Sequence, residues 1–337
     1  MATYKDIQQA TGLSLSTISK YYNGRTVLDE NRAAIEEAAE RLGFRINGFA
    51  RNLRARRSRT VGVLLPELDN DFHLSIIAGV EQALGGEGVS VLVSSSHAGG
   101  RPRNDAVDLM MSKMVDGIIA VPSANVVDAL RGVADRGVPV VMVDWVVDRL
   151  TADAVVLDNV GAGAMAARHL ADHGHRRIAM VGGLEDISTM RERAAGFESA
   201  LADRGLSPAD VLVSSGPLTV DSGHAAMQAF LALRDRPTAV FCANYELTLG
   251  ALIALNESGL RIPNDMSFIG FDSTELAQVA RPPLTVVIQP LEAIAREAAA
   301  LMSARLSGEQ NDSWEPSVVT LPGRLVIGGS VASLHSS

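Results

Sequence analysis

The sequence contains one cysteine among its 337 residues, Cys242. A single cysteine cannot form an intrachain disulfide, and such sparing use is typical of proteins from a reducing compartment. The sequence also contains no apolar run of the ~20 residues that a membrane-spanning helix needs. Its opening stretch, MATYKDIQQATG, has no basic segment leading into an apolar one, as a secretory signal would. We therefore expect a cytoplasmic protein without a membrane partner.

The short motifs of several enzyme classes are missing as well. The chain has no HExxH zinc motif, no Walker A or GxGxxG phosphate loop and no GxSxG nucleophile turn. In RHLADHGHRR, His169 and His173 stand four residues apart, a spacing that metal sites use. These histidines end an expected helix, where basic side chains suit the helix dipole. We therefore expect a structural role for them, and no catalytic residue, cofactor or metal.

Charge is distributed unevenly along the chain. Residues 1–60 contain 11 Lys/Arg and 6 Asp/Glu, whereas the whole chain contains 30 and 39. Subtraction leaves 19 and 33 for the remaining residues, so a basic head of net charge +5 precedes an acidic body of net charge −14. If nucleic acid is a partner, the head must make the contact, because an acidic body repels polyphosphate.

The head is predicted to form three short helices. Thr3 can cap the first helix, which buries Ile7 and Ala10 and ends at Gly12. Ser14 can cap the second, LSTISKYYN, which closes at Asn23-Gly24. The third, DENRAAIEEAAERLG, starts at Asp29 and ends at Gly43, and its predicted buried residues are Ala34, Ile35, Ala38 and Leu42.

Two helices around a glycine turn, followed by a supporting helix, are typical of a helix-turn-helix DNA-binding unit. On the second helix Leu15, Ser16, Ser19 and Lys20 are expected to point outward. Hydroxyl side chains bind phosphates, while a lysine or leucine can read guanine or the thymine methyl group. The alternative is a small helical bundle whose hydroxyl groups only cap helices, and the recurrence of caps, turn and polar face at this spacing favours the DNA-binding unit.

From Thr60 onward, short apolar strands alternate with amphipathic helices. TVGVLLP, VSVLVSS, GIIAVPS, VPVVMVD and AVVLD form one set of predicted strands, and RIAMVGG, DVLVSS, TAVFCA and MSFIGF form a second. Fully apolar strands separated by helices favour parallel sheets that are covered on both faces. Two such sets predict two α/β lobes.

A cleft between two such lobes would lie at the carboxyl ends of the strands, where small ligands bind open α/β sheets. Carboxylates, amides and aromatic rings suit a polyol such as a sugar, and a purine could use the same aromatic rings. Strand-end Asp and Asn also form turns without any ligand. The candidate residues after the strands are Asp69, Asn70, Asp71, Phe72, His73, Asp144, Trp145, Asn244 and Asp272.

The chain resembles the LacI/GalR family of bacterial transcription repressors. The resemblance begins in TYKDIQQATGLSLSTISKYYNG and RAAIEEAAERLGFRINGFARNLR, and it extends through most of the body, for example PTAVFCAN and GALIALNESGLRIPNDMSFIGFDS. It implies base reading by Leu15, Ser16 and Lys20. Leu15 departs from the polar residue that many relatives have. The head residues that would contact DNA, including those that would hold phosphates, are Thr3, Ser14, Leu15, Ser16, Thr17, Ser19, Lys20 and Asn23.

The same resemblance implies a core with the fold of periplasmic sugar-binding proteins and a small-molecule effector between its lobes. Arg193, in RERAAGF, would reach a ligand hydroxyl or carboxylate. Tyr245 departs from the Asp that family members commonly have after Asn244. The implied effector-binding residues are Asn70, Phe72, His73, Asp144, Trp145, Arg193, Leu218, Asn244, Asp272 and Leu291.

Between head and body lies NGFARNLRARRSR, residues 47–59, with five arginines and no acid. Asn47 could cap a helix of about nine residues, which is too short to be stable alone in water. The resemblance implies a hinge helix that orders only on DNA. Leu53 would then be a wedge between base pairs, Ala50 would allow close approach, and Arg51 and Arg54 would contact phosphates or the groove. The alternative is a charged tether.

Taken together, these features predict a helix-turn-helix domain at 1–46, a hinge at 47–59 and an effector-binding and dimerisation core at 60–337. Lobe one would span about 60–158 and 289–320, and lobe two about 159–288 and 321–337. The expected function is regulation of transcription at a palindromic double-stranded DNA operator under the control of a small molecule, most simply a sugar. The alternative is a pure solute-binding protein with an unrelated basic head. Because the C-terminal GRLVIGGSVASLHSS has no leucine heptads, we expect a homodimer.

Overall fold

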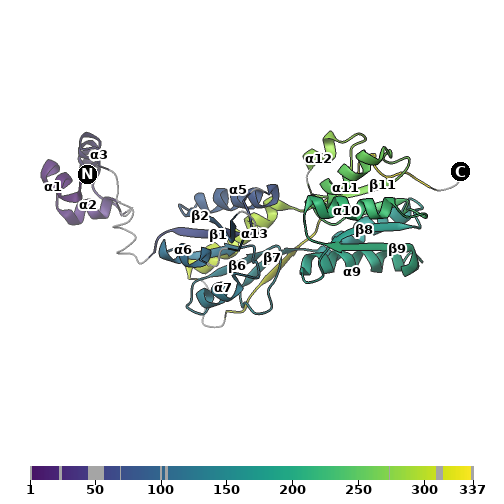
Figure 1. Cartoon of the computed structure of the whole chain (residues 1–337). Helices are drawn as coiled ribbons and strands as arrows, with labels where there is room; N and C mark the ends of the chain where they lie inside the picture. Colours follow the sequence, from purple (N-terminus) through teal and green to yellow (C-terminus); the bar gives the residue numbers. More distant parts are fainter. Residues whose placement is uncertain are drawn as a thin grey trace. The chain divides into compact units, whose positions relative to one another are not determined.

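The computed structural model divides the chain into two compact units, Met1–Ser58 and Arg59–Ser337, here called the head and the body and described separately. The head is drawn in purple in Figure 1. The residues that the structure describes are 2–22, 25–44, 57–68, 70–98, 101–102, 105–272, 274–308 and 314–334. Seven predicted site residues lie outside them: Asn23, Asn47, Ala50, Arg51, Leu53, Arg54 and Asp69.

The head consists of three helices around a small apolar core. Ile7, Ile18 and Ile35, one from each helix, are completely buried, and Tyr4 stacks on Tyr22 with their ring centroids 5.4 Å apart. Burying a large aliphatic side chain contributes roughly 1.5–3 kcal/mol, so these contacts hold the unit together. The helices are α1 (Tyr4–Thr11), α2 (Leu15–Tyr22) and α3 (Asp29–Arg41).

Three of the predicted buried positions in the head were wrong. Ala10 is exposed, Ala34 is only half-buried, and Leu42 is 38% exposed. Helix α3 ends at Arg41, and Gly43 has a φ of 59°. Leu42 therefore follows the last helical residue and does not continue the buried face that Ile35 and Ala38 define.

The first lobe of the body is a six-stranded sheet in the order β13-β7-β6-β5-β1-β2. All its neighbouring strands run parallel. One helix of this lobe comes from much later in the chain, because α13 packs beside α5 (Figure 1). The elements are β1 (Thr60–Leu65), α5 (Asp71–Gly85), β2 (Ser90–Ser95), α6 (Ala106–Ser112), β5 (Gly117–Ala120), α7 (Val127–Ala134), β6 (Val140–Val143), β7 (Asp153–Leu157), α13 (Leu291–Ser307) and β13 (Val318–Leu321), with a two-stranded ribbon of β3 (His97–Ala98) and β4 (Arg101–Pro102).

The second lobe repeats this plan in the order β14-β12-β11-β10-β8-β9. Its edge strand β14 runs antiparallel to β12, so this sheet is mixed and not fully parallel as predicted. The elements are α8 (Asn159–Asp172), β8 (Ile178–Gly183), α9 (Ser188–Ala202), the 3₁₀ helix η1 (Pro208–Asp210), β9 (Val211–Gly216), α10 (Val220–Leu231), β10 (Ala239–Cys242), α11 (Tyr245–Ser258), β11 (Ser267–Phe271), α12 (Thr274–Val279), β12 (Thr285–Ile288) and β14 (Arg324–Val326).

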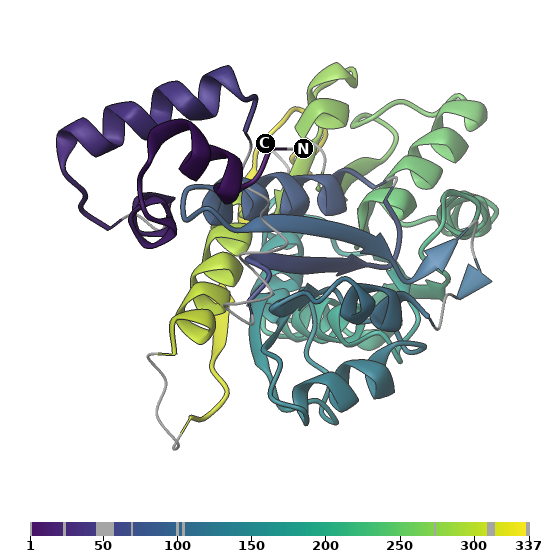
Figure 2. The ribbon, with the colours of Figure 1, turned by 90° about the vertical axis from the view of Figure 1, so that its left-hand side faces the viewer.

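Each sheet lies between two helical layers, as Figure 2 shows for β1 and β2 of the first lobe. Two separate apolar clusters cover the opposite faces of each sheet. This explains why the central strands are apolar at consecutive positions: side chains alternate between faces, and both faces are buried. Among the described helices, none is long and apolar enough to cross a membrane.

Candidate functional sites

The exposed face of α2 carries the predicted base-reading residues. Leu15 is 39% exposed, and Ser16 and Lys20 are also exposed, whereas Ile18 between them is completely buried. Ser14 accepts a hydrogen bond from the backbone N–H of Thr17 at 3.1 Å, which caps the helix. The arrangement leaves an exposed surface along α2, with Leu15 and Ser16 in its first turn and Lys20 in its last turn, opposite the buried Ile18.

Thr3, Thr17 and Ser19 are the other predicted contacts of the head that the structure describes. Thr3 is exposed, and its backbone N–H and hydroxyl both donate to Asp6, at 2.7 and 2.8 Å. Tyr21 donates its hydroxyl hydrogen to Glu36 at 2.7 Å and so ties α2 to α3. Thr17 and Ser19 are half-buried, so less of each side chain is accessible than of Ser16 or Lys20.

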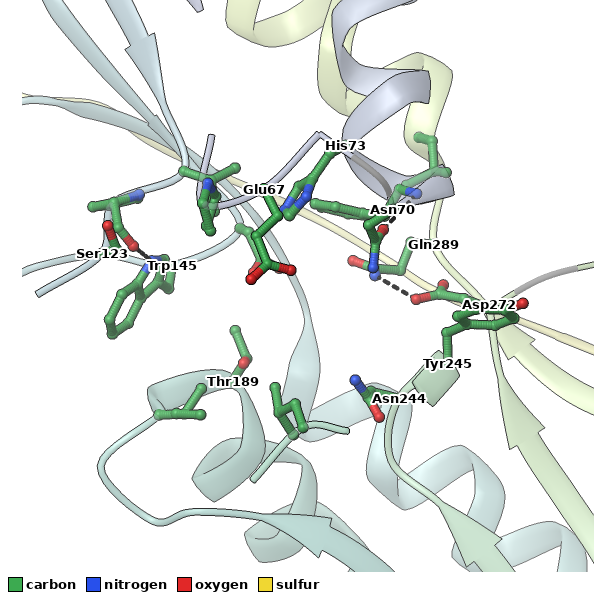
Figure 3. A pocket seen from close by; sticks show the side chains of 18 of the residues that line it. Glu67, Asn70, His73, Ser123, Trp145, Thr189, Asn244, Tyr245, Asp272 and Gln289 are labelled. Atoms are coloured by element: carbon green, nitrogen blue, oxygen red, sulfur yellow. Dashed lines mark hydrogen bonds between the residues drawn. The ribbon is translucent and has the colours of Figure 1, made fainter. Parts of the chain in front are cut away.

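In the body, all ten predicted effector residues line one cleft of about 2010 Å³. This is larger than the ~300–1,000 Å³ of most small-molecule pockets. Residues of both lobes contribute, including Asn70 and Trp145 from the first and Asn244 and Asp272 from the second (Figure 3). The ten residues are Asn70, Phe72, His73, Asp144, Trp145, Arg193, Leu218, Asn244, Asp272 and Leu291.

Two aspartates occupy equivalent places in the two lobes. Asp144 follows β6 and Asp272 follows β11, the strands that hold the same position in the two sheet orders. Both have left-handed backbones, with φ values of 75° and 60°. Both donate their backbone N–H to the adjacent strand, Asp144 to Val155 at 3.1 Å and Asp272 to Val287 at 2.8 Å. Asp tolerates this conformation better than most residues, and such positions cluster at functional sites.

Arg193, on α9, is only 3% exposed. Its Nε donates to Asn159 Oδ1 at 2.9 Å, its Nη1 donates to the Ala243 carbonyl at 2.7 Å, and its guanidinium lies 3.9 Å from the centre of the Phe271 ring. Burial lowers the pKa of Arg193, while Asp144 and Asp272 oppose this effect. A guanidinium has five N–H donors, and these contacts fix its plane before any ligand arrives.

Burial shifts the pKa of both aspartates upward. It raises the pKa of Asp272 to about 6, although Arg193 acts in the opposite direction, and it also raises the pKa of Asp144. Desolvation disfavours the ionised carboxyl in each case. Hydrogen-bond donors supplied by a ligand would stabilise these carboxylates.

Glu246 joins the two lobes across the cleft. Its carboxylate accepts from Asn70 Nδ2 of the first lobe at 2.6 Å and from Asn244 Nδ2 of the second at 2.5 Å. The oxygen of each amide accepts a backbone N–H at the start of a helix, Asn70 from Phe72 at 2.8 Å and Asn244 from Leu247 at 2.9 Å. Each asparagine thus caps its helix and contacts Glu246 simultaneously.

Several cleft residues are absent from the sequence-based set. Glu67, Thr189 and Gln289 are among them, and Figure 3 shows Glu67 directed into the cleft. Gln289 donates from Nε2 to Asp272 at 3.0 Å, and its buried Oε1 has no hydrogen-bond partner within the described part of the chain. A signal for Gln289 was available, because it directly follows the β-branched run TVVI, as the predicted residues follow their strands. Thr189 and Glu246 lie within the first turns of helices, which strand-end reasoning does not reach.

The histidines of RHLADHGHRR pack as part of the fold. The rings of His169 and His173 are 4.3 Å apart, and His173 Nδ1 lies 2.8 Å from the His169 carbonyl. His175 is buried with its ring nitrogens near Thr238 and the Ala332 carbonyl, and burial lowers its pKa to about 4. Over the residues that can be described, no group of three or more His, Cys, Asp and Glu side chains could hold a metal ion.

Comparison with known proteins identifies the family of the chain. Residues 167–331 match the periplasmic binding protein-like domain. Over 317 residues the chain is 33% identical to the HTH-type transcriptional repressor PurR of Erwinia tasmaniensis, covering 93% of each protein. The chain belongs to the LacI/GalR family of transcriptional regulators. This membership confirms the resemblance seen in the sequence.

Solved structures of the LacI/GalR family cover the head as well as the body. The lac repressor dimer bound to operator and the anti-inducer ONPF is 25% identical, with a TM-score of 0.85, over 98% of this chain and 99% of that one. A LacI family regulator of Enterococcus faecium with bound ribose is 27% identical, with a TM-score of 0.73, over 82% of this chain and all of that one. By name, these relatives are regulators of transcription.

Proposed function

We propose that the chain is a transcriptional repressor whose operator affinity changes when a sugar occupies the cleft between its lobes. Residues 1–46 bind DNA in this proposal, residues 47–59 are the hinge, and residues 60–337 bind the effector and form a homodimer. The carrying observation is that ten residues chosen from the sequence line a single interlobe cleft. The protein catalyses no reaction and acts in the cytoplasm, where its operator DNA is found.

The chemistry of the cleft supports a ligand with several hydroxyl groups. Asp144 and Asp272 offer carboxylate acceptors, and the Oε1 of Gln289 is a buried acceptor without a partner among the described residues. Phe72 and Trp145 add aromatic faces that can cover the apolar side of a sugar ring. A polyol can satisfy many buried acceptors at once, because each hydroxyl both donates and accepts. The Enterococcus faecium relative with bound ribose supports the same class of ligand.

The head supplies the DNA contacts in this proposal. The exposed residues Leu15, Ser16 and Lys20 of α2 would meet the base edges if α2 is the recognition helix, and their exposure supports this role. A homodimer would present two such helices to a palindromic operator, so a change in lobe orientation would alter their spacing. The wedge role of Leu53 stays a prediction from the sequence.

A thermal-shift screen tests the effector class. Purified protein is melted with ribose, cellobiose, a panel of other sugars, their phosphates, and the purines hypoxanthine and guanine. A ligand at 100 times its Kd stabilises the native state by about 2.7 kcal/mol, so a true effector raises Tm visibly. If only the purines stabilise the protein, the proposal that its effector is a sugar is rejected.

Operator binding is tested separately by fluorescence anisotropy. Labelled palindromic DNA from beside the protein's own gene is compared with a shuffled duplex at ~0.15 M salt, with and without the stabilising ligand. Preference for the palindrome, changed by the ligand, is the expected result. Equal affinity for both duplexes would reject the proposal that the protein is a sequence-specific repressor.

A further inference from the structure

The chain crosses between the lobes three times, and the first crossing carries a buried amide. Strand β7 belongs to the first lobe and α8 to the second, and only Asp158 separates them. Asn159 is the first residue of α8 and is 2% exposed. A carboxamide buried this deeply costs stability unless its hydrogen-bonding groups are satisfied.

The Asn159 amide makes hydrogen bonds to both lobes, with its nitrogen between β7 of the first lobe and α9 of the second, and its oxygen on α9. Its Nδ2 donates to the carbonyl of Leu157, the last residue of β7, at 3.2 Å and to Glu192 Oε2 at 3.3 Å. Its Oδ1 accepts from Arg193 Nε at 2.9 Å. One rigid planar group therefore connects the end of a first-lobe strand to Arg193, a buried charged residue of the second lobe that lines the cleft.

The remaining contacts of Arg193 come from the second lobe. They are the carbonyl of Ala243 after β10 and the ring of Phe271 at the end of β11. Without Asn159, the buried Nε–H would lose its acceptor, and a buried unpaired donor costs about 1–3 kcal/mol. The orientation of the Arg193 guanidinium therefore depends on Asn159.

The second crossing repeats this arrangement. Gln289 lies between β12 of the second lobe and α13 of the first, is 9% exposed, and donates from Nε2 to Asp272 Oδ2 at 3.0 Å. Each of these two crossings thus holds one of the oppositely charged residues of the cleft through a buried amide. Because the same arrangement occurs at two crossings, the contact between Asn159 and Arg193 is not an isolated feature of the structure.

We propose that Asn159 is a positioning residue that couples the angle between the lobes to the orientation of Arg193. Lobe rotation changes the backbone torsions around Asp158, which moves the Leu157 carbonyl relative to α8. Because the amide's nitrogen and oxygen are held in one plane, a shift at its nitrogen also shifts the oxygen that holds Arg193. By linkage, an effector that fixes Arg193 biases the lobe angle in return. The inference rests on the proposed function, since it requires an effector in this cleft.

Two variants separate the two ends of the amide. Asn159→Asp keeps an acceptor for Arg193 but has no hydrogen to donate to Leu157 or Glu192. Asn159→Leu has a similar size and loses all three hydrogen bonds. Asn256→Asp, on the exposed side of α11, is the matched control.

The first measurement needs no effector. In full-length protein with 15N-labelled arginine, the Arg193 Nε–H signal identifies a hydrogen-bonded, slowly exchanging proton. This signal should persist in Asn159→Asp and in the control, and exchange at least ~5-fold faster in Asn159→Leu, because losing an acceptor costs about 1–3 kcal/mol, which corresponds to a factor of ~5 to ~150. Unchanged exchange in Asn159→Leu would overturn the positioning role.

The second measurement uses ribose and cellobiose as probes. The ratio of operator Kd with and without saturating probe is compared among the variants, and allosteric factors of about 5–150 are typical. Asn159→Asp should bind the probe within ~5-fold of wild type while this ratio falls toward 1, whereas Asn159→Leu should bind more than ~5-fold more weakly than wild type. If wild type and Asn159→Asp give the same ratio, the coupling is wrong and the proposed function stands. If neither probe changes operator affinity in wild type, these sugars are rejected as effectors, and with them the proposed coupling.

Discussion

Replacing Asp272 by Asn should stabilise the body while abolishing its response to effector. Asp272 has a φ of 60°, a conformation that Asn adopts as readily as Asp, so the backbone is preserved. The Asn oxygen can still accept from Gln289 Nε2, which donates to Asp272 at 3.0 Å. The substitution therefore removes the negative charge and little else, unlike Asp272→Ala, which would add backbone strain.

The size of the stabilisation follows from the pKa of Asp272. Burial raises this pKa from its ordinary value of 3.8 to about 6. Because the folded state resists ionisation, the carboxyl lowers stability progressively as pH rises from about 4 to about 6, and the full cost is present above that window. At ~1.4 kcal/mol per pH unit the cost is roughly 3 kcal/mol at pH 7.5, and less than ~1 kcal/mol at pH 4.

Urea unfolding of both proteins at pH 7.5 and pH 4 measures this difference, and anisotropy measures the effector response. Asp265→Asn is the control, because hydrogen bonds from Arg261 lower the pKa of Asp265 and its ionised form is already favoured. The control should not be stabilised at either pH. An Asp272→Asn protein that is no more stable than wild type at pH 7.5, or equally stabilised at pH 4, would refute the reasoning. A variant that still responds to effector would refute the placement of the site.

Four further substitutions, one of them a control, test other contacts. Gly163→Ala should destabilise the body by about 1–3 kcal/mol and weaken effector binding, because its Cβ would lie 1.9 Å from the Arg193 carbonyl oxygen. The control is Gly132→Ala, whose Cβ would meet nothing closer than 3.7 Å. In the same urea unfolding assay this control should stabilise the body by roughly 0.5–1 kcal/mol. Ile18→Ala should cost the head about 2–5 kcal/mol, so DNA binding falls while the ligand-induced Tm shift of the body remains. Lys20→Ala should weaken operator binding. If Lys20 neutralises a phosphate, the substitution should also reduce the slope of log K against log salt concentration by about 1. An unchanged slope would mean that Lys20 contacts bases and no phosphate.

The parts of the fold that could be predicted are those whose signal is local. Strand β1 is marked by its β-branched residues, and α2 by Ser14 and an outward polar face. Strands β12, β13 and β14 were not predicted; β13 and β14 are edge strands whose residues are at most half-buried, so they lack the fully apolar run of the central strands. They also carry the crossings between lobes, and their pairing partners include strands far away in the sequence, such as β7 for β13.

In the candidate site, too, the residues with a local sequence signal could be predicted and the others could not. Asp144 and Asp272 could be chosen because each ends an apolar strand, and parallel strands end at one edge. Glu246 and Asn159 could not, because their contacts with Asn70 and Arg193 join segments 176 and 34 residues apart. Sequence spacing carries no information about such pairs until the sheets are assembled.

By itself the sequence determined the kinds of element, the basic head before the acidic body, and the residues at the strand ends, because these depend on neighbours along the chain. The tertiary structure decided which of those residues face one another. It placed two aspartates from different lobes around one buried arginine, and it brought the amides of Asn159 and Gln289 to this group from the crossings. Burial then gave those charges their shifted pKa values, and burial is a property of the packed chain that no single stretch of sequence contains.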